Sequence, residues 1–377
     1  MSSLDKKENL VTFETRALSS GKKLGLITLN SEKTLNSLNL EMVDLLQSGL
    51  LDWESNDDIA CVFLQGAGDK AFCAGGDVVA MHDASAAYGE TMSSDYIETF
   101  FTREYAVDFH IHTYKKPFIV WGNGIVMGGG LGLMSGASHR VVTDTTRMAM
   151  PEVTIGLFPD VGGTYFLNHA PGKTGLFLGL TGASINAADA LFVGLGDRYI
   201  NHKNKQQVLD ALVDADWASE GANSVVSNVL RRAERQSVDG LIEGQVQAHL
   251  SWINDTCDAD STSELVEKIT AYQGDDVWLN RALKGLVNGC PVTPYLVHEQ
   301  MQRGKHLSLA DIFRMELVMA ANCANRGHFK EGVRALLIEK DRNPQWVPAK
   351  VADVTREEVD AFFIAPWPVD EHPLKDL

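Results

Sequence analysis

Hydrophobic and polar positions follow two different periods along the first part of this 377-residue chain. Alternation over 23–30 predicts a β-strand, and apolar residues at helical spacing predict a helix over 39–53. The continuous apolar run at 59–64, ended by Gly66, is typical of a strand buried on both faces. A strand, a helix and a second strand in this order predict a right-handed parallel crossover unit.

The pattern changes from mixed to helical along the chain. A helix over 95–115, a buried strand over 118–121, a small-residue helix over 129–137 and a strand over 139–142 complete the first part. Strand signals almost vanish after about residue 170. Helices are then expected over 205–216, 222–236, 263–272, 277–287, 309–325 and 330–339. We therefore expect an α/β core over 1–220 and a mainly helical region over 221–377.

Composition narrows the class of protein. The chain is 45% hydrophobic and 22% charged, which is ordinary for a globular enzyme, and its formal net charge is −17. Nucleic acid is a poor partner for such a surface. No apolar run approaches the roughly 20 residues that span a bilayer, so no membrane association is expected. Residues 1–8 contain no apolar signal core, and five scattered cysteines lack a CxxC pair, which together favour the cytoplasm.

Two glycine clusters interrupt or follow apolar runs, at 74–77 and 127–132. Glycine lets the backbone approach a ligand closely, and two converging N–H groups form an oxyanion hole for a carbonyl oxygen. Glu152 and Asp160 follow these clusters. Enzymes that carry out acyl or enolate chemistry need groups that polarise a carbonyl and a carboxylate nearby, and these residues would supply both.

Each feature also has a purely structural explanation. Glycine clusters serve tight packing, Glu152 suits a first helical turn, and Asp160 suits a turn. Glu104 is placed on or beside the apolar face of its predicted helix, where a carboxylate needs a partner. Cys73 is interpreted as a packing residue. The histidines show no metal-ligand spacing, so no metal site is expected, and the glycines do not match a dinucleotide fingerprint.

Four ordered motifs carry a resemblance to a known family. These are Lys33-Thr34-Leu35-Asn36-Ser37-Leu38, Phe72-Cys73-Ala74-Gly75-Gly76-Asp77, Gly128-Gly129-Gly130 and Pro151-Glu152. Their order and spacing resemble the crotonase (enoyl-CoA hydratase/isomerase) superfamily over residues 12–200. The resemblance implies an α/β crotonase-like fold with a ββα superhelical core, and an acyl-CoA substrate.

Further stretches resemble the 3-hydroxyisobutyryl-CoA hydrolase branch of this superfamily. They are Arg103-Glu104-Tyr105, the run 155–163, the run 331–335 and the run 340–346. That branch implies hydrolysis of a short, branched 3-hydroxyacyl-CoA thioester in valine breakdown.

The family's residue roles transfer to particular positions. The amides of Gly76 and Gly129 would hold the thioester oxygen. Enoyl-CoA hydratases use two glutamates, of which one maps onto Glu152 and the other onto Gly132. Because glycine cannot transfer a proton, hydration is disfavoured. The hydrolase branch instead pairs the retained glutamate with Asp160, as catalytic and substrate-binding groups.

The remaining expectations concern substrate and partners. The resemblance has Glu104 contacting the substrate, and Lys33 would reach the phosphate or ribose groups of coenzyme A. No cofactor is required beyond the coenzyme A of the substrate. Family members often form trimers or hexamers, and the longer C-terminal region could block or replace such a contact. Two alternatives stay open: a hydratase or isomerase using Glu152 alone, and a non-catalytic acyl-CoA-binding protein.

Overall fold

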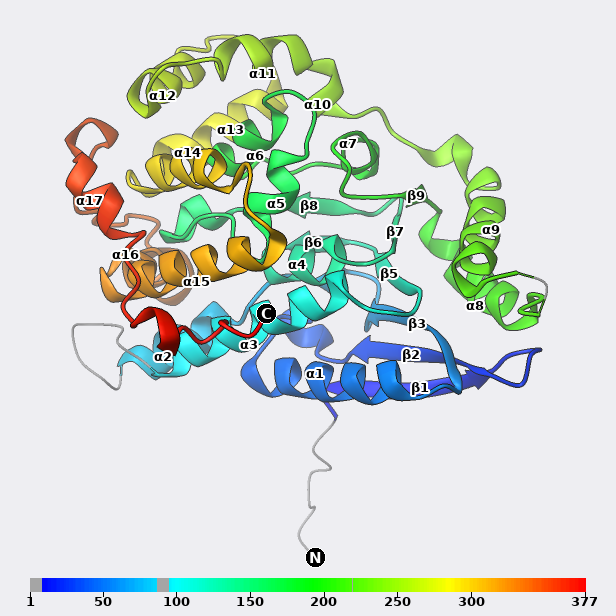
Figure 1. Cartoon of the computed structure of the whole chain (residues 1–377). Coiled ribbons are helices and arrows are strands. Elements are labelled where there is room, and N and C mark those ends of the chain that lie inside the picture. The colour runs from blue at the N-terminus through cyan, green and yellow to red at the C-terminus, as the bar shows by residue number, and fades with distance from the viewer. Residues whose placement is uncertain (1–8, 87–94, 219) are drawn as a thin grey trace, which may run out of the picture.

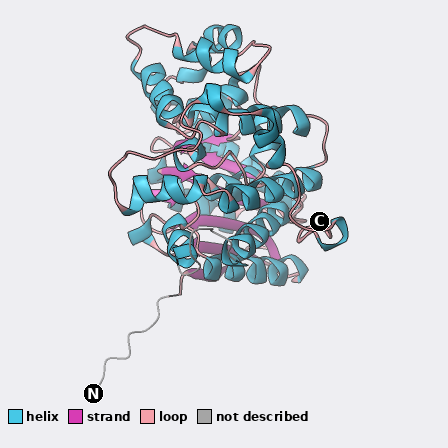
Figure 2. Ribbon diagram, turned by 90° about the vertical axis from the view of Figure 1, so that its left-hand side faces the viewer, coloured by secondary structure: helices cyan, strands magenta, loops and turns pink. Residues whose placement is uncertain are grey.

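The computed structural model describes residues 9–86, 95–218 and 220–377. Residues 1–8, on which the expectation of a cytoplasmic location partly rests, lie outside the described residues. The strands form two sheets near the middle of the molecule, with helices packed around them (Figures 1 and 2). No helix in the described ranges is long and apolar enough to cross a bilayer.

The larger sheet has six strands in the order β1-β2-β3-β5-β7-β9. Only β1 and β2 pair antiparallel, and the other neighbours are parallel. The strands are β1 (Val11–Ala17), β2 (Lys23–Leu29), β3 (Ile59–Gly66), β5 (Phe118–Gly122), β7 (His139–Val142) and β9 (Arg198–Tyr199).

The smaller sheet is parallel, with β4 (Ala71–Cys73), β6 (Ile125–Met127) and β8 (Arg147–Ala149) in chain order. The pairs β3/β4, β5/β6 and β7/β8 therefore each give one strand to each sheet. This repetition is the ββα superhelix, and the expected fold class is confirmed. Strands of three residues are too short to show a period, which is why the sequence pattern did not reveal them.

The larger sheet packs against helices on both faces. Leu24, Phe63 and Trp121 belong to an apolar cluster with side chains of α8 (Lys205–Asp214) and α9 (Ala222–Arg235), at the right of Figure 1. Their strand neighbours Val62 and Val120 face the main core instead. Because successive strand residues point to opposite faces and both faces are covered, β3 is apolar from Ile59 to Leu64, as the sequence predicted.

The first helices of the core lie near their expected positions. α1 (Leu40–Ser55) is capped by Asn39, whose side chain accepts a hydrogen bond from the Met42 amide. The others in this part are α2 (Val78–Ala86), α3 (Asp95–His112), α4 (Gly129–Ser135), α5 (Gly163–Asn168), α6 (Thr174–Thr181) and α7 (Ala187–Phe192).

Helices dominate after α9, as expected. They are α10 (Gln245–Ala248), α11 (Leu250–Thr256), α12 (Thr262–Thr270), α13 (Val277–Asn288), α14 (Thr293–Gly304), α15 (Leu309–Asn325), α16 (His328–Val333) and α17 (Arg356–Ala361). The main core cluster includes side chains from both sides of residue 220. The division into two domains at that residue stays a prediction.

One expected helix, over 330–339, is wrong as a single α-helix. α16 ends at Val333, and residues 334–338 form a π-turn, closed by a hydrogen bond from the Glu339 amide to the Arg334 carbonyl. The Arg334 guanidinium binds Glu331, Glu339 and Asp341 and holds this turn together. The segment matters because it reaches the candidate site.

Candidate active site

The first glycine cluster lies directly after β4. Gly75 has a φ of +104°, a conformation that favours glycine. Its carbonyl accepts a hydrogen bond from the Leu38 amide (2.8 Å), and the Asp77 amide donates to the Leu38 carbonyl (2.7 Å). These two bonds fix the peptide between them, which contains Gly76.

The second glycine cluster joins β6 to α4. Gly128 has a φ of +48° and precedes the helix, so Gly129 is the first helical residue and its amide has no partner within the helix. The two clusters approach closely, because a Cβ on Gly75 would lie 3.6 Å from the Gly129 nitrogen. In the described part of the chain, neither the Gly76 amide nor the Gly129 amide donates a hydrogen bond. Two free donors thus lie on adjoining loops.

Glu152 opens the short 3-10 turn η2 (Glu152–Ile155) and is buried. Its Oε1 lies beside Gly128, 3.1 Å from the position a Cβ would take there. Its Oε2 is buried and has no hydrogen-bond partner among the described residues. Burial, and then the charge of Asp160, raise the pKa of Glu152 well above its usual value.

Asp160 follows η2 on the loop before α5 and is also buried. The Tyr105 hydroxyl on α3 donates a 2.7 Å hydrogen bond to its Oδ2. Burial raises the pKa of Asp160 to about 6, while this hydrogen bond opposes the rise by stabilising the carboxylate.

Glu104 lies one residue before Tyr105 on α3 and is 2% exposed. Its carboxyl group occupies the space that a side chain on Gly129 would need. Burial, and then the charge of Asp160, raise its pKa well above the usual value. The prediction that Glu104 faces the apolar side of its helix is confirmed by this burial.

Five of the predicted residues line one pocket of about 180 Å³: Gly76, Glu104, Gly129, Glu152 and Asp160. Its remaining wall is mainly apolar, and no lysine, arginine or histidine of the described residues lines it. The volume is below the roughly 300–1,000 Å³ of pockets that hold drug-sized ligands, so it suits a short acyl group. No group of three metal-ligating side chains suited to a metal ion occurs among the described residues.

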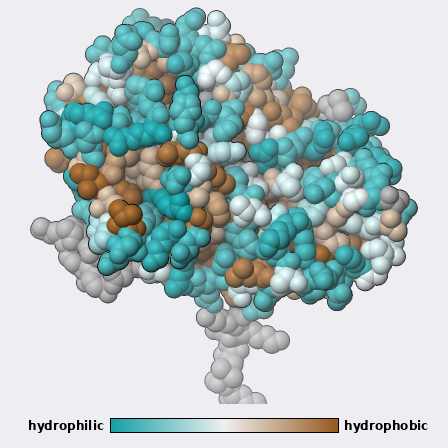
Figure 3. Space-filling view, in the orientation of Figure 1, coloured by the Kyte–Doolittle hydropathy of each residue, from teal (hydrophilic) through white to brown (hydrophobic). Residues whose placement is uncertain are grey.

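The C-terminal region completes this pocket. Leu336 and Leu337, in the π-turn after α16, form part of the wall. Figure 3 shows hydrophobic surface gathered at the left of this face, around the position of α16 in Figure 1. The sequence pattern gave no sign that this segment reaches the glycine loops, because that contact depends on how the C-terminal helices pack.

Two other predicted positions lie outside the pocket. Lys33 is exposed on the 3-10 turn η1 (Glu32–Thr34) and does not line it. Gly132 is packed behind it, where a Cβ would lie 2.7 Å from Cβ of Val161 and 2.8 Å from Oδ2 of Asp108. Cys73 is buried, and burial raises the pKa of its thiol to about 12, which agrees with a packing role.

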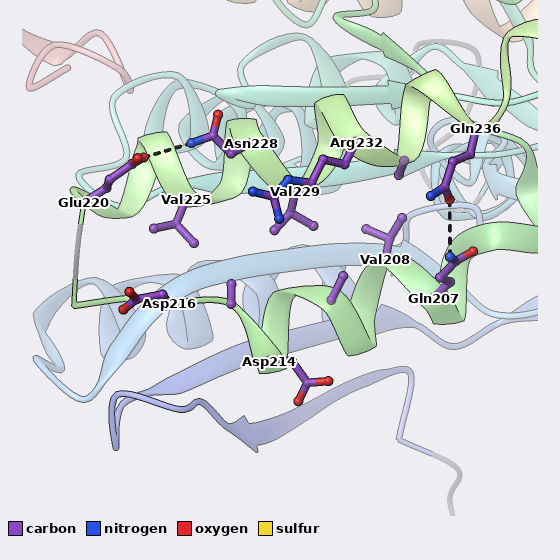
Figure 4. Close-up of a pocket in the computed structure, with 13 residues that line it drawn as sticks. Gln207, Val208, Asp214, Asp216, Glu220, Val225, Asn228, Val229, Arg232 and Gln236 are labelled. Atoms are coloured by element: carbon purple, nitrogen blue, oxygen red, sulfur yellow. Dashed lines mark hydrogen bonds between the residues drawn. The ribbon is translucent and has the colours of Figure 1, made fainter.

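A larger cavity lies elsewhere in the fold. It measures about 440 Å³ and lies between α8 and α9 (Figure 4). Its wall mixes apolar side chains such as Val225 and Val229 with exposed polar ones, and it contains none of the glycine-loop amides or buried carboxyl groups. We therefore place the chemistry in the smaller pocket.

Sequence reasoning assigned no role at the site to three side chains that lie around it. Tyr105 binds Asp160, Asp108 lies behind Glu104, and Glu316 on α15 accepts hydrogen bonds from the Gly162 and Thr164 amides (2.7 and 2.8 Å). Burial raises the pKa of Glu316 to about 8. Asp108 falls four residues after Glu104, a helical spacing that was available in the sequence.

The sequence of this chain matches a known protein family. A sequence model of the enoyl-CoA hydratase/isomerase family matches residues 24–363. The chain belongs to this family. Among curated relatives, the mitochondrial 3-hydroxyisobutyryl-CoA hydrolase of Danio rerio is 38% identical over 354 residues, 94% of this chain and 89% of the relative. The Gallus gallus protein of the same name is 38% identical over 341 residues, covering 90% and 86%.

Solved structures of family members show the same fold over nearly the full chain. A carnitinyl-CoA dehydratase from Mycobacterium thermoresistibile is 34% identical, with a TM-score of 0.83 and coverage of 97% of this chain and 98% of that one. An enoyl-CoA hydratase from Rhodobacter sphaeroides is 29% identical, with a TM-score of 0.80 and coverage of 94% and 97%. The fold is therefore shared by relatives with different named activities, and residues within the site must distinguish them.

Proposed function

We propose that this protein hydrolyses 3-hydroxyisobutyryl-CoA to 3-hydroxyisobutyrate and coenzyme A. One observation carries the proposal: two unpaired glycine amides and the carboxyl groups of Glu152 and Asp160 line a single small pocket, while a glycine stands at position 132. The 3-hydroxyisobutyryl-CoA hydrolases among the relatives give the substrate class.

In this mechanism the amides of Gly76 and Gly129 bind the thioester carbonyl oxygen. They stabilise the negative charge of the tetrahedral intermediate, and one such donor contributes about 3 kcal/mol to lowering the barrier. Glu152 acts in one of two ways. It takes a proton from the attacking water, or its carboxylate attacks to give a mixed anhydride that water then opens.

In either route the C–S bond breaks and the thiolate of coenzyme A leaves with a proton. Asp160 passes this proton from the attacking water to the thiolate, or binds the hydroxyl group of the substrate. Glu104 helps to bind that hydroxyl. A site built to hydrogen-bond a hydroxyl rejects acyl groups that lack one, because its own polar groups would stay unpaired. The proposed chemistry requires no metal or redox cofactor.

Three further proposals accompany this function. Lys33 would contact the phosphate or ribose groups of coenzyme A outside the acyl pocket. The reaction would serve valine breakdown. We propose the cytoplasm as its compartment, which cell fractionation tests, whereas the two vertebrate relatives are named as mitochondrial proteins.

The test is a substrate panel assayed by release of free thiol. Hydrolysis of 3-hydroxyisobutyryl-CoA, with much slower release from isobutyryl-CoA, supports the hydrolase. Hydration of crotonyl-CoA without thiol release would instead support the hydratase alternative, the activity named for the Rhodobacter sphaeroides structure. Binding of these thioesters without any turnover would support the non-catalytic alternative.

A further inference from the structure

α3 carries a second buried carboxyl group that the proposed reaction does not use. Asp108 is fully buried, and neither of its carboxyl oxygens has a hydrogen-bond partner among the described residues. A buried polar group without a partner is costly, so an unpaired carboxyl group beside an active site requires an explanation.

The position of Asp108 relative to Glu104 follows from two helices. The Glu104 carboxyl lies against Gly129, and Asp108 Oδ2 lies against Gly132, 2.8 Å from the position of a Cβ there. Glu104 and Asp108, four residues apart on α3, thus lie against Gly129 and Gly132, three residues apart on α4. The two carboxyl groups therefore neighbour each other on one face of α3. Glu104 lines the pocket and Asp108 does not, so Asp108 lies behind Glu104.

The groups around Asp108 are acidic. The negative charges of Glu104 on the same helix, Asp160 on the loop before α5 and Glu316 on α15 repel a charge on Asp108. A charge on Asp108 would likewise raise the pKa of the Cys73 thiol of β4. No cation contributes to its surroundings in the described residues. Burial, and then the charge of Glu104, raise the pKa of Asp108 well above its usual value.

Two interacting buried carboxyl groups without a cation do not both ionise readily. The member that lies behind the pocket wall keeps a proton, because it has less access to solvent. Asp108 faces Glu104, Asp160 and Glu316, whereas Glu104 borders the pocket. A neutral Asp108 adds no charge behind Glu104, whose carboxyl group borders the pocket.

We propose that Asp108 is a positioning residue that stays protonated in the folded protein, so that no additional negative charge lies behind Glu104 where this residue meets the hydroxyl group of the substrate. The part concerning the substrate rests on the proposed function. The location of the proton does not.

Unfolding as a function of pH tests the proton without any substrate. If Asp108 is neutral in the folded protein, unfolding at neutral pH releases its proton, whereas the Asp108→Asn variant has no such proton. The ratio of the two unfolding constants, wild type over variant, should then rise up to tenfold per pH unit between about pH 5 and 7. Asp52→Asn, at an exposed position of α1, is the control substitution. A ratio that is constant over this range overturns the proposal.

Kinetics test the positioning. In Asp108→Asn, the acid limb of kcat/KM for 3-hydroxyisobutyryl-CoA should stay in place, because a neutral group has replaced a neutral group. A shift of this limb to lower pH would mean that a negative charge had been removed, and would overturn the proposal. If Asp108→Asn does not fold, Asp108→Ser serves in both measurements. Failure of the wild type to release thiol would reject the proposed function, while the unfolding ratio would still show whether the folded protein holds a proton that depends on Asp108.

Discussion

The hydroxyl of Tyr105 donates a 2.7 Å hydrogen bond to Oδ2 of Asp160, joining α3 to the loop that follows Glu152. This contact lies within a set of buried acidic groups and is the one side-chain hydrogen bond to Asp160 found in the described residues. It stabilises the carboxylate form against the effect of burial. Asp160 therefore keeps a pKa of about 6 and is ionised at neutral pH.

Removing that hydrogen bond should move the pH dependence of the enzyme. Tyr105→Phe deletes the donor, so the pKa of Asp160 rises. Hydrogen bonds to charged groups contribute about 1.5–3 kcal/mol, which corresponds to roughly one to two pH units. The acid limb of kcat/KM, expected near pH 6 in the wild type, should move up by this amount. An unmoved acid limb would mean that ionised Asp160 is not required.

The proposed oxyanion site predicts that substitution of one glycine, Gly129, lowers kcat. A Cβ on Gly129 would collide with the Glu104 carboxyl and lie 3.4 Å from Leu38. Gly129→Ala should displace the amide and lower kcat by about 10²–10³-fold, the usual cost of one oxyanion donor. Gly221→Ala is the matched control, because that glycine precedes α9 and a Cβ there would have no atom of the described residues within 4 Å. Comparable activity of the two variants would remove Gly129 from the mechanism.

The packing around Gly132 predicts that a single substitution at this position does not turn the protein into a hydratase. Gly132→Glu restores the residue type of a hydratase, but the space is filled by Val161 and Asp108, each under 3 Å from the added Cβ. Overpacking of this kind costs about 1–3 kcal/mol of stability. The variant should melt at a lower temperature and should not hydrate crotonyl-CoA. A stable variant with hydratase activity would contradict the packing described for Gly132.

The C-terminal wall predicts a change in acyl specificity. Leu337 lines the pocket, whereas its neighbour Ile338 does not. Leu337→Ala enlarges the pocket, and a buried methylene contributes about 0.8 kcal/mol, so longer acyl chains should gain several-fold in relative kcat/KM. Ile338→Ala is the control and should leave the preference unchanged. Equal effects of the two changes would place the acyl group elsewhere.

Glu316 predicts a pH dependence of stability. Its folded-state pKa is about 8, against about 4.5 in an unfolded chain, so the folded state binds the extra proton between these values. Its contribution is complete at low pH, and stability falls as pH rises toward 8. Glu316→Gln keeps an acceptor oxygen for only one of the Gly162 and Thr164 amides, so it should lower stability overall, but it removes the titrating group and should flatten this decline. Thermal melts from pH 5 to 8 would show the difference, and parallel curves would contradict it.

Much of the core could be predicted from local pattern. β3 and β5 are continuous apolar runs because they pack on both faces, and β7 and α15 occupy the predicted residues. The strands β4, β6 and β8 could not be predicted, because three residues show no period. The single helix expected over 330–339 was wrong, since the ion pairs of Arg334 and the π-turn depend on side-chain contacts that spacing does not reveal.

The candidate site was predicted in part. Gly76, Glu104, Gly129, Glu152 and Asp160 line one pocket, although the sequence alone places them far apart. Their catalytic roles stay predictions. The hydrogen bond of Tyr105 and the burial of Asp108 were not predicted, because both arise from the packing of α3 against α4 and the loop that holds Asp160.

The most direct test of the account is the rate of thiol release from 3-hydroxyisobutyryl-CoA by the wild type and by Glu152→Gln. The substitution keeps the size of the side chain but removes the carboxylate that activates water or attacks the thioester. We predict rapid release by the wild type and a loss of kcat of at least about 10²-fold in the variant, the scale of general acid–base catalysis. Equal rates in the two proteins, or no release by the wild type, would contradict the account.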